Sequence, residues 1–433
     1  MRALRFVLTV VAGAAVAIAN DNDFKKGMEA LYTGRYPQAV EPLSRAYKDF
    51  ERAGPPRQME FDAAAVALSS AYQYQGRLDD AERIITPLVT RWRESKTPYL
   101  IAAVDSLASV YALQGKSLEA RQLATQSVEF AREHFGADHR TTRGSMMHLA
   151  NLDAQQGRLP DADDLLSAAL ESARRSHVDD AELVPILTNV GKLKVMRQDY
   201  KGAIDSLREA VFLAGKLNGQ DLVVAETTYS LAAAYYQSGH PERAEPLVKA
   251  AIAKYESIAG PDSPALGGAI MLQADVALSN RRVGVAEKQL NRAVQLLTTA
   301  FGPEDVEVAV AQSKLGELCL ATNRPAEAER LLSHAIPILE RAYGVPHPRL
   351  ATALSDMAEL LALQGSYEQA AQYYKRAING FEASAYRGEP YMRTLEAYGR
   401  LLEQTNKREA RDVRNRAKTM SQFLLRQNVG LDY

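Results

Sequence analysis

The chain has 433 residues, with 52 Lys and Arg against 53 Asp and Glu and a formal net charge of −1. A balance so close to neutral gives no support to a general nucleic-acid-binding protein. The single cysteine, Cys319, excludes an intramolecular disulfide framework. It stands at an apolar position of the pattern described below, which predicts a small buried side chain.

Residues 1–19 are typical of a secretory signal peptide. Arg2 and Arg5 precede an uncharged apolar run over 6–18, and Ala17-Ile18-Ala19 supplies the small residues of a cleavage site. The run is shorter than the roughly 20 residues that a membrane-spanning helix needs. We therefore expect cleavage after Ala19, a periplasmic or secreted product, and no integral membrane segment in the mature chain.

From residue 20 the sequence repeats with a period of about 42 residues, which predicts stacked structural units. The clearest marker is an alanine at the same place in every unit. These alanines are Ala39, Ala81, Ala120, Ala162, Ala203, Ala244, Ala286, Ala328 and Ala370. A small residue lies twelve positions before each alanine, as Ala108 and Gly191 do, and another small side chain usually follows it by seven. Such fixed small positions indicate that two helix backbones approach closely.

A turn residue stands five positions before each alanine. The turn residues are Gly34, Gly76, Gly115, Gly157, Gln198, Gly239, Arg281, Asn323 and Gly365. Glycine, and to a lesser degree asparagine, adopts the left-handed conformation that ends a helix. Apolar residues at helical spacing flank each turn, as Leu354, Met357 and Leu361 do before Gly365. Each unit is therefore predicted to be a helix, a tight turn and a second helix.

The repeats at the two ends depart from this pattern. The first pair is expected over 23–33 and 37–50, and a degenerate tenth pair over 390–404 and 408–425. The predicted repeat domain spans 20–418, followed by a tail over 419–433. The last helix is basic, with Lys407, Arg408, Arg411, Arg414, Arg416 and Lys418. A polar face on a terminal repeat is favoured over nucleic-acid or membrane binding, because the helix lacks a strong aromatic face.

The pattern resembles the tetratricopeptide repeat. The match is close in Leu107-Ala108-x-x-Tyr111-x-x-x-Gly115-x-x-x-x-Ala120. The longer unit resembles the 42-residue variant of kinesin light chains and many bacterial proteins. This resemblance implies an all-α, right-handed superhelical solenoid of about ten stacked helix-turn-helix repeats, with the first helix of each pair lining a concave groove. The paired asparagines that line the kinesin-type groove are absent here except for Asn189, so that cargo specificity is not expected.

The sequence marks no catalytic centre. It contains no glycine-rich phosphate loop, Gly-x-Ser-x-Gly elbow or His-Glu-x-x-His helix. His134, Asp138 and His139 lie close together and include zinc-ligand types, but capping of two successive helices is the favoured interpretation. We therefore predict no enzyme activity, no metal and no cofactor.

The candidate ligand-binding residues lie on the first helices, which the resemblance places on the concave groove. Asp275, Glu317 and Glu359 recur at 42-residue spacing and form an acidic row, which favours a basic ligand or is a solvated helix face. Toward the middle of the predicted groove, before the acidic row in its C-terminal third, polar and aromatic side chains could bind a peptide or pack within the groove. They are Asn189, Lys192, Glu226, Tyr229 and Tyr236.

Two functions of different kinds follow from these features. The first is an exported interaction scaffold, or adaptor, that binds a peptide or protein segment in the concave groove, with a basic segment favoured. The second is an envelope assembly or export factor that docks on a membrane machine and handles exopolysaccharide or outer-membrane protein. A large exposed apolar patch would favour the second. The sequence leaves the oligomeric state open.

Overall fold

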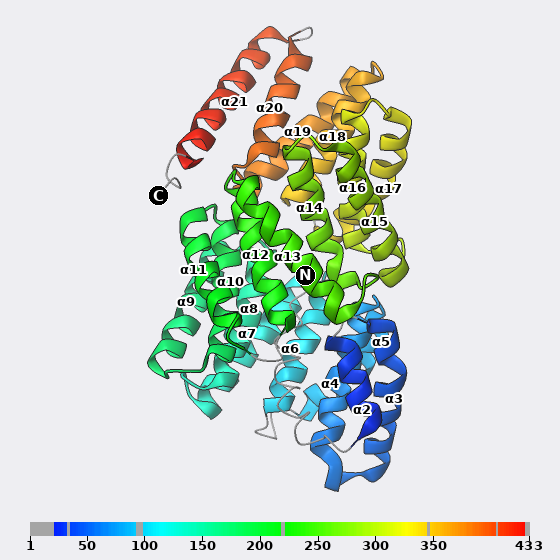
Figure 1. Cartoon of the computed structure of the whole chain (residues 1–433), viewed down its shortest axis with the longest axis vertical. Coiled ribbons are helices and arrows are strands. Elements are labelled where there is room, and N and C mark those ends of the chain that lie inside the picture. The colour runs from blue at the N-terminus through cyan, green and yellow to red at the C-terminus, as the bar shows by residue number, and fades with distance from the viewer. Residues whose placement is uncertain are drawn as a thin grey trace. The chain divides into compact units, whose positions relative to one another are not determined.

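The structure is a computed structural model that describes residues 21–32, 35–91, 98–217, 221–343, 347–403 and 406–428. The expected signal peptide (1–19), the turn residue Gly34 and the last five residues of the predicted tail lie outside these ranges. The described residues form α-helices and short 3-10 turns and contain no strand. The protein is an all-α repeat solenoid built from consecutive helix pairs (Figure 1). No helix in the described ranges is long and apolar enough to cross a membrane.

Ten helix pairs follow one another along the described chain. The first five pairs are α2 (Asn22–Tyr32) with α3 (Tyr36–Ala53), α4 (Gln58–Tyr74) with α5 (Leu78–Arg91), α6 (Pro98–Leu113) with α7 (Ser117–Phe135), α8 (Arg140–Gln155) with α9 (Leu159–Arg175), and α10 (Asp180–Met196) with α11 (Tyr200–Ala214). The other five are α12 (Asp221–Gln237) with α13 (Pro241–Ala259), α14 (Gly267–Ser279) with α15 (Val283–Phe301), α16 (Val306–Ala321) with α17 (Pro325–Tyr343), α18 (Pro348–Leu363) with α19 (Tyr367–Ala383), and α20 (Glu389–Leu402) with α21 (Lys407–Asn428).

The chain divides into two compact units. The first comprises Met1–Tyr235 and Arg243–Ala269, and the second comprises Tyr236–Glu242 and Ile270–Tyr433. The division falls near the C-terminal end of α12 and within α14, although the repeat continues through it in the sequence. Each unit contains its own helix pairs and its own apolar clusters.

The repeating alanine is the point of closest packing in every unit. All nine of these alanines have no solvent-exposed surface. Two of the three glycines that stand twelve positions earlier are tightly constrained: a Cβ atom on Gly191 would lie 2.4 Å from Cγ of Leu207, and one on Gly27 would lie 2.4 Å from Cγ of Leu43, while one on Gly316 would lie 3.0 Å from Cγ of Leu332. The predicted close approach of the two helices is confirmed, because real Cβ contacts are longer than this.

The predicted turns are confirmed by their backbone conformation. The eight that lie in the described ranges all have positive φ, including Gln198 at 63°, Arg281 at 57° and Asn323 at 59°. A non-glycine residue adopts this left-handed conformation at some cost in free energy. The fold therefore imposes the turn even where the sequence does not supply glycine.

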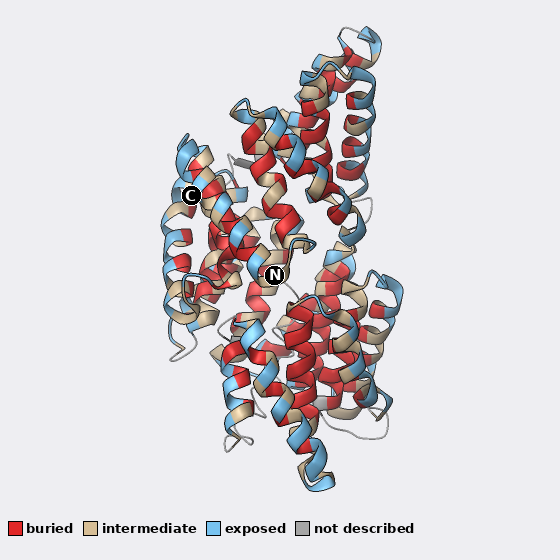
Figure 2. Cartoon of the chain, turned by 90° about the vertical axis from the view of Figure 1, so that its right-hand side faces the viewer, coloured by how far each residue is buried: buried red, intermediate tan, exposed pale blue. Residues whose placement is uncertain are grey.

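The two helices of a pair differ in burial. First helices are apolar over most of their circumference: residues 62–74 of α4 are all buried. Second helices bury only one stripe, as Ala81, Ile85 and Leu88 of α5 do. Figure 2 shows the buried residues concentrated where helices face one another, with the exposed residues on the outer sides. A helix that is apolar all round must be enclosed by others. Charged residues nevertheless occur on the first helices, and the buried ones include Asp105, Arg143 and Asp356.

The C-terminal pair packs as a final repeat. Helix α21 buries Ala410, Val413, Ala417 and Met420 in the cluster that includes Tyr398 of α20. This apolar stripe includes Met420, which lies beyond the predicted end of the repeat domain at 418, and the helix extends to Asn428 rather than to 425. The basic residues of α21 are exposed, as the cap interpretation expects.

Candidate functional site

The first helices of neighbouring repeats contact one another in both units. In the first unit α4 contacts α6, α6 contacts α8 and α8 contacts α10, while in the second α16 contacts α18 and α18 contacts α20. Side chains on successive first helices can therefore meet across repeats. In the second unit we call six of the charged side chains on these helices the first-helix face. They are Asp275 of α14, Lys314 and Glu317 of α16, Asp356 and Glu359 of α18, and Arg393 of α20.

In the first unit, two of the predicted ligand-binding residues form an ion pair. Nζ of Lys192 on α10 lies 2.7 Å from Oε1 of Glu226 on α12. Glu226 is mostly buried and Lys192 is about one-third exposed. Asn189 is half-buried one turn before Lys192. Tyr229 lies against the start of α14, because a Cβ atom on Gly268 would be 3.0 Å from its hydroxyl oxygen. The structure thus places these residues together on consecutive first helices.

In the second unit, Asp275 is paired by the chain itself. Nζ of Lys314, on the next first helix, donates to both carboxylate oxygens of Asp275 at 2.8 Å. Burial nevertheless raises the pKa of Asp275 above its ordinary value, and the charge of Lys314 lowers it. The predicted acidic row therefore does not present Asp275 as an unpaired carboxylate.

Glu317 is also paired, and its partner comes from two repeats further along the chain. Nη2 of Arg393 on α20 lies 2.5 Å from Oε1 of Glu317 on α16. The third acid of the row, Glu359 on α18, is exposed. The three carboxylates predicted from the 42-residue spacing thus lie on one face, and two of them are held by cations that the spacing did not identify.

Tyr236, at the C-terminal end of α12, lies near Asp275. Burial and then the charge of Asp275 raise the pKa of the Tyr236 phenol, and a hydrogen bond with Ser279 lowers it. The tyrosine is half-buried. Both roles that its spacing allows, packing and ligand contact, remain compatible with this position.

Asp356, which was not among the residues predicted from the sequence, is the most enclosed charged residue of the first-helix face. It is 3% exposed, and its Oδ2 atom is buried without a hydrogen-bond partner in the described part of the chain. Burial and the charge of Glu317 raise its pKa well above the ordinary value, and Arg393 lowers it. Asp356 occupies the position that holds Asn189 four repeats earlier and, with Lys314, could have been noticed as a charge on an apolar helix.

The first unit contains a second buried carboxyl outside the predicted site. Asp105 of α6 has no exposed surface, and burial raises its pKa to about 7. The hydroxyl of Ser145 on α8 donates to its Oδ2 atom at 3.1 Å, and the hydroxyls of Ser145 and Ser127 are 2.9 Å apart. The other carboxyl oxygen, Oδ1, has no partner among the described residues. This group lies between helices and serves packing rather than an accessible site.

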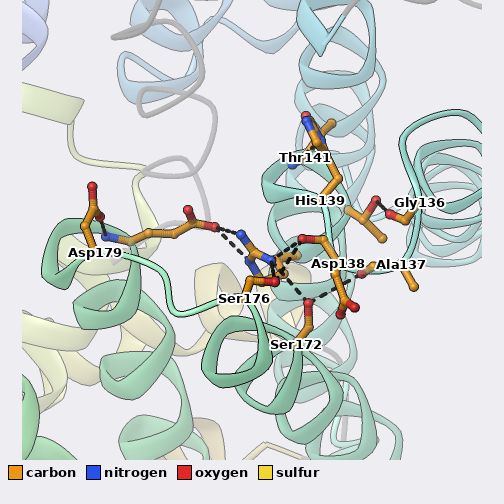
Figure 3. A network of polar contacts seen from close by, with 11 residues as sticks. Gly136, Ala137, Asp138, His139, Thr141, Ser172, Ser176 and Asp179 are labelled. Carbon is orange, nitrogen blue, oxygen red and sulfur yellow. Dashed lines mark hydrogen bonds and ion pairs between the residues drawn. The ribbon is translucent and has the colours of Figure 1, made fainter.

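His139 and His134 bond main-chain groups at the start of α8 and near the end of α7, as the capping interpretation expects, and Figure 3 shows His139 beside Thr141. His139 is the N-cap of α8, and its Nδ1 atom accepts a hydrogen bond from the main-chain N of Thr141 at 3.2 Å. Nδ1 of His134 lies 2.9 Å from the main-chain O of Phe130 near the end of α7. Asp138 pairs with Arg175 at 2.8 Å. No group of three His, Cys, Asp or Glu in the described ranges is placed to hold a metal ion.

The segment over 136–139, the linker between α7 and α8, is held by the buried side chain of Arg143. Nε of Arg143 donates to Oε1 of Glu182 at 2.8 Å, and Nη1 donates to Oγ of Ser172 at 3.2 Å. Nη1 also donates to the main-chain O of Asp138. Figure 3 shows these contacts joining the linker to α9 and to the start of α10. The contacts satisfy Arg143 within the fold, so this network is structural.

Comparisons with known proteins give a consistent family signal. Two family models, both described as Tetratricopeptide repeat, match residues 268–341 and 324–383 in one case and 100–141, 142–180 and 224–265 in the other. Together they match more than half of the chain. A search of curated proteins found no match.

Solved structures show the same fold at low sequence identity. The Rap protein in complex with Competence and Sporulation Factor is 11% identical, with a TM-score of 0.58 over 85% of this chain and 99% of that chain. The apo form of the quorum sensor NprR from B. thuringiensis is 13% identical, with a TM-score of 0.53 over 84% of this chain and 99% of that chain. BtubC (BKLC) from P. vanneervenii is 20% identical over 52% of this chain and 92% of that chain, with a TM-score of 0.43.

Proposed function

Because the chain belongs to the tetratricopeptide repeat superfamily, we propose that it is an exported interaction scaffold that binds a segment of a partner protein on its first helices. Tetratricopeptide repeat proteins are generally scaffolds rather than enzymes, and a stacked repeat offers an extended surface rather than a reaction centre.

One observation carries the proposal: in the second unit, charged side chains from several first helices gather beside buried apolar residues. Lys314 reaches back to Asp275, and Arg393 reaches back to Glu317, so charges from four consecutive first helices meet on one face. A stable fold does not need charged groups at these positions, because the corresponding positions of other repeats hold small or apolar residues such as Ala67, Leu272 and Ala233. Charges held at partly enclosed positions are typical of recognition surfaces.

The similar structures support the same kind of function. The Rap protein was solved with Competence and Sporulation Factor bound, and NprR is described as a quorum sensor. Both share the fold over most of this chain. Their ligands are not assigned to this chain, and only the use of a repeat solenoid to bind another molecule is carried over.

The charges on the first-helix face favour a basic segment. Asp275, Glu317, Asp356 and Glu359 outnumber Lys314 and Arg393 on this face, and Arg349 of α18 adds a third cation near Asp275. An excess of carboxyl groups attracts cationic ligands and raises their rate of association at low ionic strength.

Export is the second part of the proposal. It depends on Arg2, Arg5, the apolar run over 6–18 and the small residues that end at Ala19. N-terminal sequencing of the protein recovered from its host tests it: a mature chain that begins at Asn20 supports export, and an intact N-terminus in the cytoplasm contradicts it.

The alternative function, docking on a membrane assembly or export machine, would be favoured by a large exposed apolar patch. The strongly exposed large apolar residues come from eight different helices: Met59, Leu118, Met196, Phe212, Val283, Val285, Leu363, Tyr367 and Phe423. They are spread along the described helices, and docking on a membrane machine remains one outcome of the capture experiment.

The experiment is capture of partners by the mature chain from its host's envelope, followed by mass spectrometry. The test variant combines Asp275→Asn, Glu317→Gln and Glu359→Gln, which removes charge without placing lysine beside Lys314 or Arg393. The control variant combines Glu287→Gln, Glu340→Gln and Glu368→Gln on second helices. The controls match because Glu287 and Glu340 are paired with arginines and Glu368 is exposed.

Loss of a discrete protein from the test variant alone supports binding on the first helices. Capture of membrane machinery that both variants retain supports the alternative. Capture that neither variant changes, with no membrane machinery among the captured proteins, contradicts the proposed site.

A further inference from the structure

Asp356 lies at the centre of the first-helix face, and one of its carboxyl oxygens is unsatisfied. Asp356 lies on α18, which contacts both α16, with Lys314 and Glu317, and α20, with Arg393. The charges of Glu317, Arg393, Glu359 and Lys314 all act on it. Of the two cations, Lys314 is bonded to Asp275 and Arg393 to Glu317. The Oδ2 atom of Asp356 is therefore buried without a hydrogen-bond donor in the described ranges. Leaving a buried acceptor unsatisfied is unfavourable, and a donor that reached it would bind more tightly for that reason.

Arg393 reaches this place from an unusual distance along the chain. Its contact with Glu317 spans 76 residues and two repeats, whereas the pairing of Asp275 with Lys314 spans 39 residues and one repeat. To reach α16 from α20, the guanidinium passes α18, the helix that carries Asp356 and Glu359. The Arg393 side chain is still about half exposed, so a ligand can reach it from the solvent.

We propose that Arg393 is an intramolecular substitute for an arginine of the bound segment, and that the ligand's guanidinium displaces it to bind Glu317, Asp356 and Glu359. The inference rests on the proposed function and adds two things to it: the chemical class of the anchoring side chain, and a contact within the chain that competes with the ligand.

A guanidinium fits these acceptors better than an ammonium or a metal ion. Its planar fork carries five donors, enough to serve Glu317 and the unpartnered oxygen of Asp356 together. The chain's own occupant is already a guanidinium, and one arginine can replace another without new geometry. A metal ion is disfavoured because no metal-binding group of side chains is formed here in the described residues.

The test measures binding of a fluorescent Gly-Ser peptide that contains arginine, and of the same peptide with citrulline in place of arginine, to the full-length mature protein at low salt. Citrulline keeps the shape of arginine and removes its charge. Arg393→Gln should strengthen binding of the arginine peptide about tenfold, the equivalent of one charge-assisted hydrogen bond, and leave the citrulline peptide unchanged. Adding Asp356→Asn to that variant should abolish the gain.

The matched control is Arg376→Gln, because Arg376 is a similarly exposed arginine paired with Glu340 on the second helices. Arg393→Lys should fall between the wild type and Arg393→Gln, and it keeps the test open if the glutamine variant fails to fold. Circular dichroism verifies helicity for each protein. Equal or weaker arginine-dependent binding by a folded Arg393→Gln variant overturns the inference, as does an equal gain in Arg376→Gln.

Failure of this inference is distinguishable from failure of the proposed function. If the captured partner is lost from the Asp275/Glu317/Glu359 variant but Arg393→Gln shows no preference for arginine over citrulline, the first helices bind a partner and Arg393 is not its substitute. If neither experiment responds to changes on the first-helix face, both proposals fail.

Discussion

The guanidinium of Arg393 lies 2.5 Å from the carboxylate of Glu317, which comes 76 residues earlier in the chain. The two residues belong to α20 and α16, so the contact crosses the first helix of the intervening repeat. Most polar contacts between repeats in this protein join neighbours, as expected for stacked units in which each repeat meets only the next one. The contact between Arg393 and Glu317 therefore identifies the part of the second unit where side chains of three repeats converge.

The pH dependence of stability should reveal the buried Asp105. Its pKa is about 7 in the fold and about 4 in an unfolded chain. Between these values the folded protein keeps the proton that the unfolded chain has released, so stability is lost as pH rises from about 4 to about 7. Asp105→Asn removes this loss. Chemical denaturation followed by circular dichroism should show the variant about 1–3 kcal/mol more stable than wild type at about pH 8 and nearly equal at about pH 4.

Asp153→Asn is the control for this prediction. Asp153 is equally buried but is paired with Arg121 and Arg158. Its amide variant should be destabilised near neutral pH, because breaking a buried pair leaves charge uncompensated. If Asp105→Asn is also destabilised at about pH 8, the fold stabilises the Asp105 carboxylate, and the raised pKa is wrong.

Gly191→Ala should destabilise the first unit by about 1–3 kcal/mol, the usual cost of overpacking a core. The new Cβ atom would lie 2.4 Å from Cγ of Leu207, which is fully buried and has no room to move. Helix propensity alone predicts the opposite sign, because alanine is favoured over glycine by about 1 kcal/mol.

Gly316→Ala provides the comparison at the same repeat position. Its Cβ atom would lie 3.0 Å from Cγ of Leu332, so we expect a smaller effect in thermal denaturation. A Gly191→Ala variant that melts at or above the wild-type temperature would be incompatible with the close helix approach described here.

Arg281→Gly should stabilise the second unit by about 1 kcal/mol. Arg281 has φ of 57° at the turn between α14 and α15, a conformation that costs a residue with a Cβ atom about 1–2 kcal/mol. Asn323→Gly at the equivalent turn should gain less, because asparagine tolerates this conformation better. The melting temperatures of the two variants test the order, and a loss of stability in Arg281→Gly would show that its side chain contributes more than its backbone costs.

The periodic part of this fold was predictable because the repeat constrains backbone geometry. Alanines such as Ala81 and Ala120 stand at the position of each repeat where its two helices touch. Glycines such as Gly115 stand where the chain must take positive φ, so the spacing of the two positions identifies both helices of each pair. Gln198 and Arg281 were assigned to turns by register alone, and their φ angles confirm that assignment. The end of α21 was less predictable. Its sequence is mostly polar, and it stays helical where Met420 packs in the apolar cluster that includes Tyr398.

The candidate site was only partly predictable. The 42-residue spacing places Asp275, Glu317 and Glu359 on one face, because equivalent positions of stacked repeats align. It does not reveal that Lys314 and Arg393 neutralise two of them, since those contacts depend on side-chain reach across one and two repeats. The sequence does not single out Asp356, because a charge in the middle of an apolar helix indicates burial or function equally well until its surroundings are known.

The most direct test of binding on the first helices is partner capture by the mature chain, compared with the Asp275→Asn, Glu317→Gln, Glu359→Gln variant and with the Glu287→Gln, Glu340→Gln, Glu368→Gln control. We predict that a discrete partner is lost from the first-helix variant and retained by the control, with both proteins equally helical. Retention of the same partner by both variants would contradict binding on the first helices.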